Sequence, residues 1–196
     1  MPADTIARRD DAVLVIVDEQ ERLTAVMERR DEVVSAAIRL VRTAALVGMP
    51  IVVTRQYPKG LGDTDATLAA AIEAARSAGA SVTEIDKVAF DCFGEPAFAK
   101  ALERSSRRQM LLAGMETHIC VAQTALSALR AGFDVHVADD ACCSRDGGNH
   151  GSALERMRAA GTVVTTTESA MYELVGEAGT DEFRALLAIV KNETRT

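Results

Sequence analysis

The chain has 196 residues, of which 48% are hydrophobic and 26% are charged. This is an ordinary globular composition, so fibrous and disordered classes are excluded, and the length predicts one domain over residues 1–196. Lysine and arginine number 22 against 29 aspartate and glutamate, a formal net charge of −7. That sign opposes a surface that tracks phosphates, so we expect no nucleic-acid partner.

No apolar run approaches the roughly 20 residues that a membrane-spanning helix needs, so we expect no membrane partner. The N-terminus has no basic region followed by an apolar run, so it does not resemble a secretory signal and we expect a cytoplasmic protein. In that compartment cysteines stay reduced, and we expect free thiols at all four positions: Cys92, Cys120, Cys142 and Cys143.

Six short β-rich runs alternate with helical stretches along the chain, at residues 13–17, 51–54, 81–85, 110–113, 135–138 and 162–164. This alternation predicts repeated βαβ units around a parallel sheet. The first run, Val13 to Val17, is apolar at every position, as expected for a strand that helices cover on both faces. We therefore expect it to be a central strand.

Helical stripes of apolar residues occupy positions 33–44, 121–129 and 183–190. The first ends near Gly48, the second stops at Gly132, and the third follows Thr180 and Asp181, which are suitable for a helix N-terminus. We expect the third helix to close the fold. The glycine-rich segments 60–63 and 146–149 predict loops, and we interpret residues 147–151 as a flexible loop instead of a phosphate site.

Three chemically useful side chains follow predicted strands. Asp18 follows the first run, Lys87 the third, and Cys120 begins the helix after the fourth. Ligands of open parallel sheets bind at the carboxyl ends of the strands, so we expect the three groups at one edge. Free N–H groups and the dipole at the helix start favour the thiolate of Cys120. Each residue alone has a structural alternative, as a packed thiol, a loop cap or a solvated charge, and their joint placement favours a catalytic site.

Metal and nucleotide sites lack their usual patterns. His118, His136 and His150 do not have the spacing of zinc ligands, and Cys142 and Cys143 are adjacent, so we expect no metal. His136 falls inside a predicted strand and is expected to pack in the sheet. No GxGxxG follows the first run and no GxxxxGK[ST] occurs, so we expect no cofactor. A redox role for a strained Cys142–Cys143 disulfide stays open as an alternative.

Several motifs in this order resemble the isochorismatase-like cysteine hydrolases, which include nicotinamidases and N-carbamoylsarcosine amidases. They are VIVDEQ at residues 15–20, KVAF at 87–90 and GMETHICV at 114–121. QYPKGLG at 56–62 and DACCSR at 140–145 are most similar to the branch called isochorismatase domain-containing proteins. The resemblance covers residues 10 to 175.

The resemblance implies a three-layer α/β/α fold around a six-stranded parallel sheet in the order 3-2-1-4-5-6. It also implies a catalytic triad of Asp18, Lys87 and Cys120. A non-proline cis peptide is expected near Met115-Glu116, and the backbone N–H groups of Glu116 and Cys120 are expected to form an oxyanion hole. The strand order places Asp18 and Cys120 beside the topological switch point that the strand pattern indicates independently.

The sequence departs from nicotinamidases, which hold a metal through an aspartate and two histidines after the second strand. Residues 54–59 contain no histidine, which favours a metal-free site. We therefore predict a small-molecule hydrolase, a homo-oligomer, that cleaves an amide or related C–N bond through a thioester. Gln56, Tyr57 and Arg145 are candidate substrate-binding residues. The alternative is a catalytically silent binding or scaffold protein of the same fold, and the substrate stays open.

Overall fold

The computed structural model describes residues 4–191, which build a six-stranded, all-parallel sheet. The strand order is β3-β2-β1-β4-β5-β6, as the resemblance implies. The strands are β1 (Ala12–Val17), β2 (Ile51–Gln56), β3 (Val82–Lys87), β4 (Gln109–Met115), β5 (Asp134–Cys143) and β6 (Val163–Thr165). The first strand pairs with β2 and β4 and is central, as its unbroken apolar run predicts.

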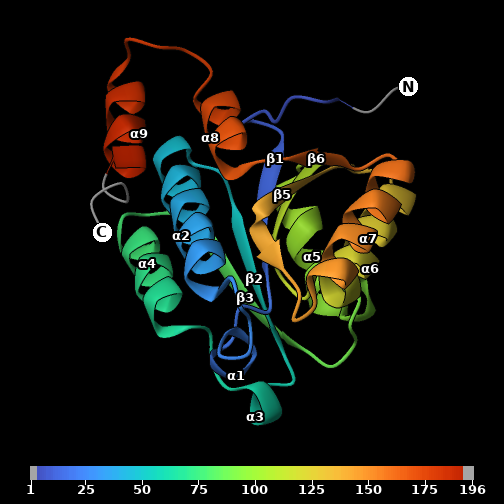
Figure 1. Cartoon of the computed structure of the whole chain (residues 1–196). Coiled ribbons are helices and arrows are strands. Elements are labelled where there is room, and N and C mark those ends of the chain that lie inside the picture. Colours follow the sequence, from blue (N-terminus) through green and yellow to red (C-terminus); the bar gives the residue numbers. More distant parts are fainter. Residues whose placement is uncertain (1–3, 192–196) are drawn as a thin grey trace.

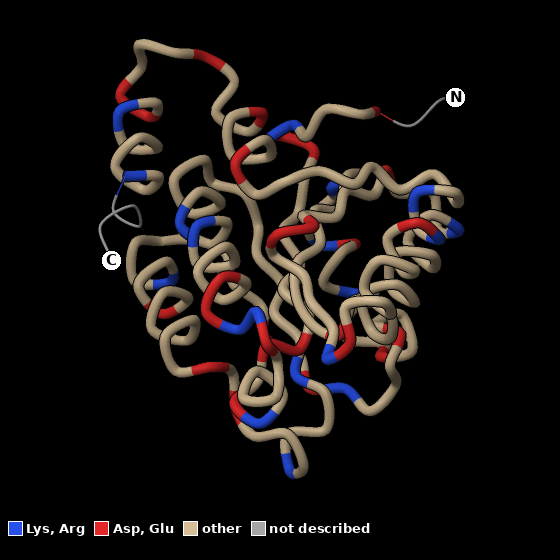
Figure 2. The backbone as a smooth tube through the Cα atoms, viewed as in Figure 1, with Lys and Arg blue, Asp and Glu red and all other residues tan. Residues whose placement is uncertain are grey.

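Helices cover both faces of the sheet and complete the predicted three layers (Figure 1). One layer contains α2 (Arg30–Val47), α4 (Ala66–Ser77), α8 (Thr167–Val175) and α9 (Asp181–Lys191), and the other contains α5 (Pro96–Ser105), α6 (Ala122–Arg130) and α7 (Gly147–Ala159). Within residues 4–191, no helix has the length and apolar character needed to cross a membrane. Figure 2 shows charges of both signs interspersed, mainly on the helices and connections.

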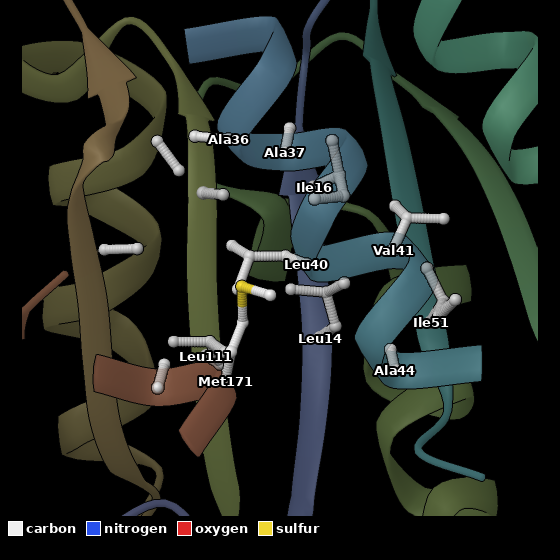
Figure 3. Packing of buried hydrophobic residues seen from close by; sticks show 14 of the residues in the cluster. Leu14, Ile16, Ala36, Ala37, Leu40, Val41, Ala44, Ile51, Leu111 and Met171 are labelled. Carbon is white, nitrogen blue, oxygen red and sulfur yellow. The ribbon is translucent and has the colours of Figure 1, made fainter. Parts of the chain in front are cut away.

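The core lies on both sides of β1 because its side chains alternate between the two layers. Leu14 and Ile16 face α2, whereas Val13 and Val15 face the layer of α5 and α6, and all four are fully buried. Figure 3 shows Leu14 packed beneath Leu40 of α2. Truncation of a buried leucine to alanine typically costs about 2–5 kcal/mol, so this contact fixes β1 firmly.

Short helical turns follow four of the strands at the carboxyl edge of the sheet. They are α1 (Glu21–Thr24) after β1, α3 (Pro58–Leu61) after β2, η1 (Cys92–Gly94) after β3 and η2 (Thr117–Val121) after β4. The loop predicted at 60–63 is therefore wrong for its first two residues. Pro58 begins α3, and its fixed φ suits the first position of a helix.

The loop predicted at 146–149 is also wrong, because α7 begins at Gly147 and continues through the segment expected to be flexible. Asp146 is its N-cap, and its side chain accepts the N–H of Asn149 at 2.8 Å. A capping carboxylate satisfies a free donor of the first turn and interacts favourably with the helix dipole. This compensates for the poor helix propensity of glycine in that turn.

β5 is longer than predicted and extends to Cys143, with a register shift against β4 between Leu112 and Gly114. Consecutive strand residues point to opposite faces, so Cys142 packs in the core beneath α5 and α6 while Cys143 packs beneath α2. All four cysteines are free thiols, as expected. The opposed Cys142 and Cys143 side chains rule out the vicinal disulfide in this fold.

Candidate active site

Asp18 follows β1 and has a φ of 53°, in the left-handed region that few non-glycine residues adopt. Its carboxylate is fully buried, and each oxygen has a donor. The Thr54 hydroxyl donates to Oδ1 at 2.7 Å, and Lys87 Nζ donates to Oδ2 at 2.6 Å. The acid and the amine predicted at the sheet edge therefore form a direct ion pair.

Lys87 ends β3 and is also buried, with its ammonium enclosed by oxygen atoms. Besides Asp18, Nζ donates to Gln56 Oε1 at 2.6 Å and to the carbonyls of Ala89 at 3.2 Å and Phe90 at 3.3 Å. Burial alone would lower the pKa of Lys87, but Asp18 and two nearby thiols raise it above its ordinary value. The residue stays an ammonium ion.

Gln56, expected to bind substrate, instead holds Lys87. Its Nε2 donates to the Val88 carbonyl at 2.6 Å, which orients Oε1 toward the ammonium. Gln20 in turn fixes the backbone of Gln56, accepting its N–H at 2.7 Å and donating to its carbonyl at 3.1 Å. The role of Gln20 has no signal in the sequence beyond its place two residues after Asp18.

Residues 88–90 have two roles in the geometry, because their backbone and side chains face opposite ways. All three carbonyls accept hydrogen bonds from Lys87 or Gln56, whereas the side chains of Val88 and Phe90 are 76% and 54% exposed. Tyr57 is 54% exposed, like Phe90, and its backbone N–H donates to the Lys87 carbonyl at 2.8 Å. Tyr57 thus lies on an apolar rim beside the ion pair.

The end of β4, which leads into the turn that carries Cys120, lies close against the end of β1 at a glycine. Gly114 has a φ of 128°, and a Cβ there would lie 2.0 Å from the Val17 carbonyl oxygen. Only glycine permits this approach. The Met115-Glu116 peptide that follows is cis, as the resemblance implies, and η2 then brings Cys120 to the edge where Asp18 and Lys87 meet.

Cys120 is 4% exposed and interacts with both members of the ion pair. Burial raises the pKa of its thiol most, the Asp18 carboxylate raises it further, and Lys87 lowers it. Burial and the carboxylate therefore oppose the helix-start effect expected to favour thiolate, and they favour a thiol that holds its proton. The acceptor for that proton is already adjacent.

A second thiol, missed in the sequence, adjoins the same cluster. Cys92 in η1 is fully buried, and its Sγ lies 3.9 Å from the Thr54 hydroxyl that binds Asp18. Burial raises the pKa of Cys92 to about 11, although Lys87 opposes the shift. Because Cys92 is less exposed than Cys120, we assign it to packing around the acid.

Arg145, the third predicted substrate contact, is paired with Glu116. Its backbone N–H and Nε donate to Glu116 Oε2 at 2.9 and 3.2 Å. The Glu116 side chain is 5% exposed, whereas that of Arg145 is 60% exposed and reaches solvent at the start of the Cys120 turn. The structure therefore places Arg145 near the turn, bound to protein.

The residues at the end of β2 are not arranged to bind a metal ion. The Gln56 side-chain oxygen is occupied by the Lys87 ammonium at 2.6 Å, and Thr54 donates to Asp18. Within residues 4–191, no three histidine, cysteine, aspartate or glutamate side chains are grouped so that they could hold a metal ion. The oxygen ligands at this edge are arranged around an ammonium group.

The isochorismatase domain family model matches residues 12–169, which include every strand of the sheet. Isochorismatase domain-containing protein 2 of Bos taurus is 36% identical over 181 residues, 92% of this chain and 83% of that protein. The secreted isochorismatase effector Isc1 of Phytophthora sojae is 34% identical over 186 residues, 94% of this chain and 86% of that protein.

Solved structures are similar over the same extent. The MAR1 ribonuclease of Caenorhabditis elegans has a TM-score of 0.84 at 30% identity and covers 94% of this chain and 92% of its own. The YcaC gene product of Escherichia coli, described as an octameric hydrolase of unknown specificity, has a TM-score of 0.86 at 25% identity, with 100% and 95% covered.

Proposed function

The chain belongs to the isochorismatase domain family of hydrolases, and on this premise we propose that it cleaves a small-molecule amide or related C–N bond with Cys120 as nucleophile. One observation carries the proposal: Asp18 and Lys87 form a fully buried ion pair that acts electrostatically on the Cys120 thiol. Two buried charges are costly to desolvate, and such pairs beside a nucleophile are typical of active sites.

In the first half-reaction, Asp18 accepts the thiol proton as Cys120 Sγ bonds to the substrate carbonyl carbon. Lys87 stabilises the charges on sulfur and carboxylate during this transfer. The tetrahedral oxyanion accepts hydrogen bonds from the backbone N–H groups of Glu116 and Cys120, and such donors contribute about 3–4 kcal/mol each in acyl-transfer enzymes. The C–N bond then breaks, the amine takes the proton from Asp18, and a thioester remains on Cys120.

In the second half-reaction, water attacks the thioester while Asp18 accepts its proton. The second tetrahedral intermediate collapses with loss of sulfur, the carboxylic acid leaves, and the Asp18 proton returns to Cys120. Gln56 and Gln20 act here through Lys87, because they touch the ammonium and its support. Tyr57 and the exposed Arg145 guanidinium are the proposed contacts for the substrate at the rim.

We propose no cofactor and no metal for this reaction, since the oxygen atoms at the site bind the Lys87 ammonium. We propose that the whole chain acts as one domain and assembles as a homo-oligomer, as the name of the E. coli neighbour states for that protein. We also propose a cytoplasmic location, which suits four free, buried thiols.

A nucleic-acid substrate is not proposed, although the C. elegans neighbour is called a ribonuclease. The net charge of −7 opposes binding of a phosphate backbone, and Figure 2 shows basic and acidic residues interspersed. The remaining alternative is a catalytically silent binding or scaffold protein. It shares the fold but predicts that Cys120 forms no acyl adduct.

The test is acyl transfer to Cys120. p-Nitrophenyl acetate serves as the probe, and a panel of small amides that includes nicotinamide is assayed for released amine or ammonia. We expect a burst of p-nitrophenolate, an acetyl group mapped to Cys120 by peptide mass spectrometry, and loss of both in Cys120→Ser. Cys143→Ala is the matched control and should retain the burst. Acetylation that persists in Cys120→Ser, or none in the wild type, would contradict the proposal.

A further inference from the structure

A chain of side-chain hydrogen bonds links the Cys120 turn to α7 and β5. The Thr117 hydroxyl lies 2.9 Å from His150 Nδ1, and His150 Nε2 lies 2.8 Å from Asp139 Oδ1. Thr117 is the first residue of η2, His150 belongs to the first turn of α7, and Asp139 lies in β5. Three elements distant in sequence thus meet at one imidazole.

This series of hydrogen bonds runs from a buried residue to an accessible one. Thr117 is fully buried, whereas the side chains of His150 and Asp139 are 14% and 44% exposed. A carboxylate only accepts hydrogen bonds, so the ring donates from Nε2–H to Asp139, and in the neutral tautomer Nδ1 accepts from the Thr117 hydroxyl. Asp139 therefore selects the tautomer that holds Thr117.

Two neighbouring links join the same segments, but they differ in strength. Glu116 pairs with Arg145, whose side chain is 60% exposed, and exposed ion pairs contribute little. His118 Nδ1 lies 2.9 Å from the Ser144 hydroxyl. Thr117 is fully buried, so without His150 its hydroxyl would lose its hydrogen bond at a place where water does not readily replace it.

The η2 turn places both the Cys120 sulfur and the backbone N–H groups proposed as oxyanion donors. Thr117 lies three residues before Cys120, so a shift at its side chain is transmitted directly to that turn. A reacting atom displaced by about 1 Å can cost 100-fold in rate. The Asp18–Lys87 pair is held by hydrogen bonds that do not involve Thr117, His150 or Asp139.

We propose that His150 is a positioning residue, oriented by Asp139, which holds Thr117 and thereby aligns the Cys120 turn with Asp18. This inference rests on the proposed function of Cys120 as nucleophile and extends it. His150 touches no reacting atom. Its loss should therefore lower the rate of acyl transfer and leave the binding of substrate nearly unchanged.

Two amide substitutions test the contacts of the two imidazole nitrogens one at a time. The Asn side chain places its amide near the position of Nδ1, and the longer Gln side chain reaches the position of Nε2. With p-nitrophenyl acetate, His150→Asn should keep the Thr117 contact and a burst rate constant within about threefold of wild type, because misalignment is what costs rate. His150→Gln keeps Asp139 but releases Thr117, and its burst rate constant at saturating ester should fall at least about tenfold, while the ester concentration that gives half this rate stays within about twofold.

Asp146→Ala is the matched control, since it removes the N-cap of α7 without touching Thr117. Loss of an N-cap typically costs about 1 kcal/mol, so it shows what a weaker α7 does by itself. Urea unfolding of each variant gives its stability. The inference is overturned if the burst rate constant of His150→Gln matches that of wild type, or if His150→Asn loses as much of it as His150→Gln.

The outcome for Cys120→Ser separates the two proposals. If Cys120→Ser is inactive and His150→Gln keeps the wild-type burst rate constant, only the positioning role fails. If Cys120→Ser still transfers acetyl, the proposed function and the positioning role both fail. Inactive Cys120→Ser with the expected order of His150→Asn over His150→Gln supports both.

Discussion

The two halves of the candidate site are held in different ways. The acid and amine half, from β1 to β3, consists of a fully buried ion pair whose partners are a hydroxyl, an amide and backbone carbonyls. The thiol half, from β4 to α7, is held by hydrogen bonds and one ion pair that reach partly exposed residues. The charged half is closed to water and the nucleophile half has an accessible side.

Because of this difference, we expect the two halves to respond differently to substitution. Buried charges interact strongly because little water screens them, and removal of one partner leaves the other uncompensated. Neutral hydrogen bonds contribute about 0.5–1.5 kcal/mol each, so the turn that carries Cys120 adjusts at lower cost. We expect substitutions in the first half to act on stability and those in the second to act mainly on rate.

The largest effect should come from Lys87→Met, which leaves the Asp18 carboxylate buried without its ammonium. Breaking such a pair typically costs about 3–5 kcal/mol, measured here by urea unfolding. For the same reason Asp18→Asn should destabilise the fold as well as abolish proton transfer. The double variant Asp18→Asn/Lys87→Met should recover part of the loss. A single Lys87→Met variant as stable as wild type would show that the buried ion pair does not hold the first half together.

A smaller loss is expected for Thr54→Val, which keeps the shape of the side chain but removes the hydroxyl that donates to Asp18 at 2.7 Å. Hydrogen bonds to charged groups contribute about 1.5–3 kcal/mol, so unfolding should require that much less free energy. Thr43→Val is the matched control, because the Thr43 hydroxyl is buried with no partner among the described residues. Equal losses in the two variants would show that the bond to Asp18 contributes nothing.

Glu19 differs from the neighbouring Asp18, because it is buried with no hydrogen-bond partner for either oxygen among residues 4–191. Burial, and then Asp65, raise the pKa of Glu19 well above its ordinary value. Between the pKa of Glu19 in the unfolded state and its higher pKa in the folded state, the folded protein therefore holds a proton that the unfolded protein releases. The resulting stability is complete below the unfolded pKa of about 4.3 and is lost as pH rises through the folded value, by at most about 1.4 kcal/mol per pH unit.

Glu19→Gln should remove this slope, because an amide does not titrate. Unfolding free energies at several pH values above 4 give the slope for each protein, and the exposed Glu28→Gln serves as control. Parallel curves for wild type and Glu19→Gln would mean that Glu19 ionises normally in the fold.

The smallest effect is expected for Arg145→Ala in the thiol half. The guanidinium is 60% exposed, and exposed ion pairs contribute about 0–1 kcal/mol, so stability should change by less than 1 kcal/mol. High salt should reduce even this difference. A loss as large as that of Lys87→Met would mean that the two halves are held alike.

The acid and amine half was accessible from sequence because its residues directly follow strands. Asp18 ends an unbroken apolar run and Lys87 ends β3, so topology alone predicted that they meet. The contact of Gln56 with Lys87 could not be predicted, because the sequence places Gln56 near the end of β2 but does not show which way its amide points. That direction depends on Val88, a residue from the neighbouring strand connection.

The thiol half was harder to predict from the sequence, because its contacts join segments whose secondary structure the residue pattern predicts wrongly. Residues 147–150 contain two glycines and were expected to form a loop, yet the capping Asp146 makes them the first turn of α7. His150 therefore faces Thr117 only because a helix forms where the composition favours a turn. The burial of Cys120, which raises the pKa of its thiol, was not accessible either, since it depends on the folded geometry.

The backbone of residues 88–90 has a consequence for how this scaffold can diversify. Every residue type supplies a carbonyl, so the Gln56 amide and the Lys87 ammonium keep these acceptors whatever side chains occupy positions 88 and 90. Those side chains are free of the core and border the ion pair. Mutation can therefore explore new surfaces beside the reactive groups without disturbing the buried charge, and the range of molecules accepted can drift while the chemistry stays fixed.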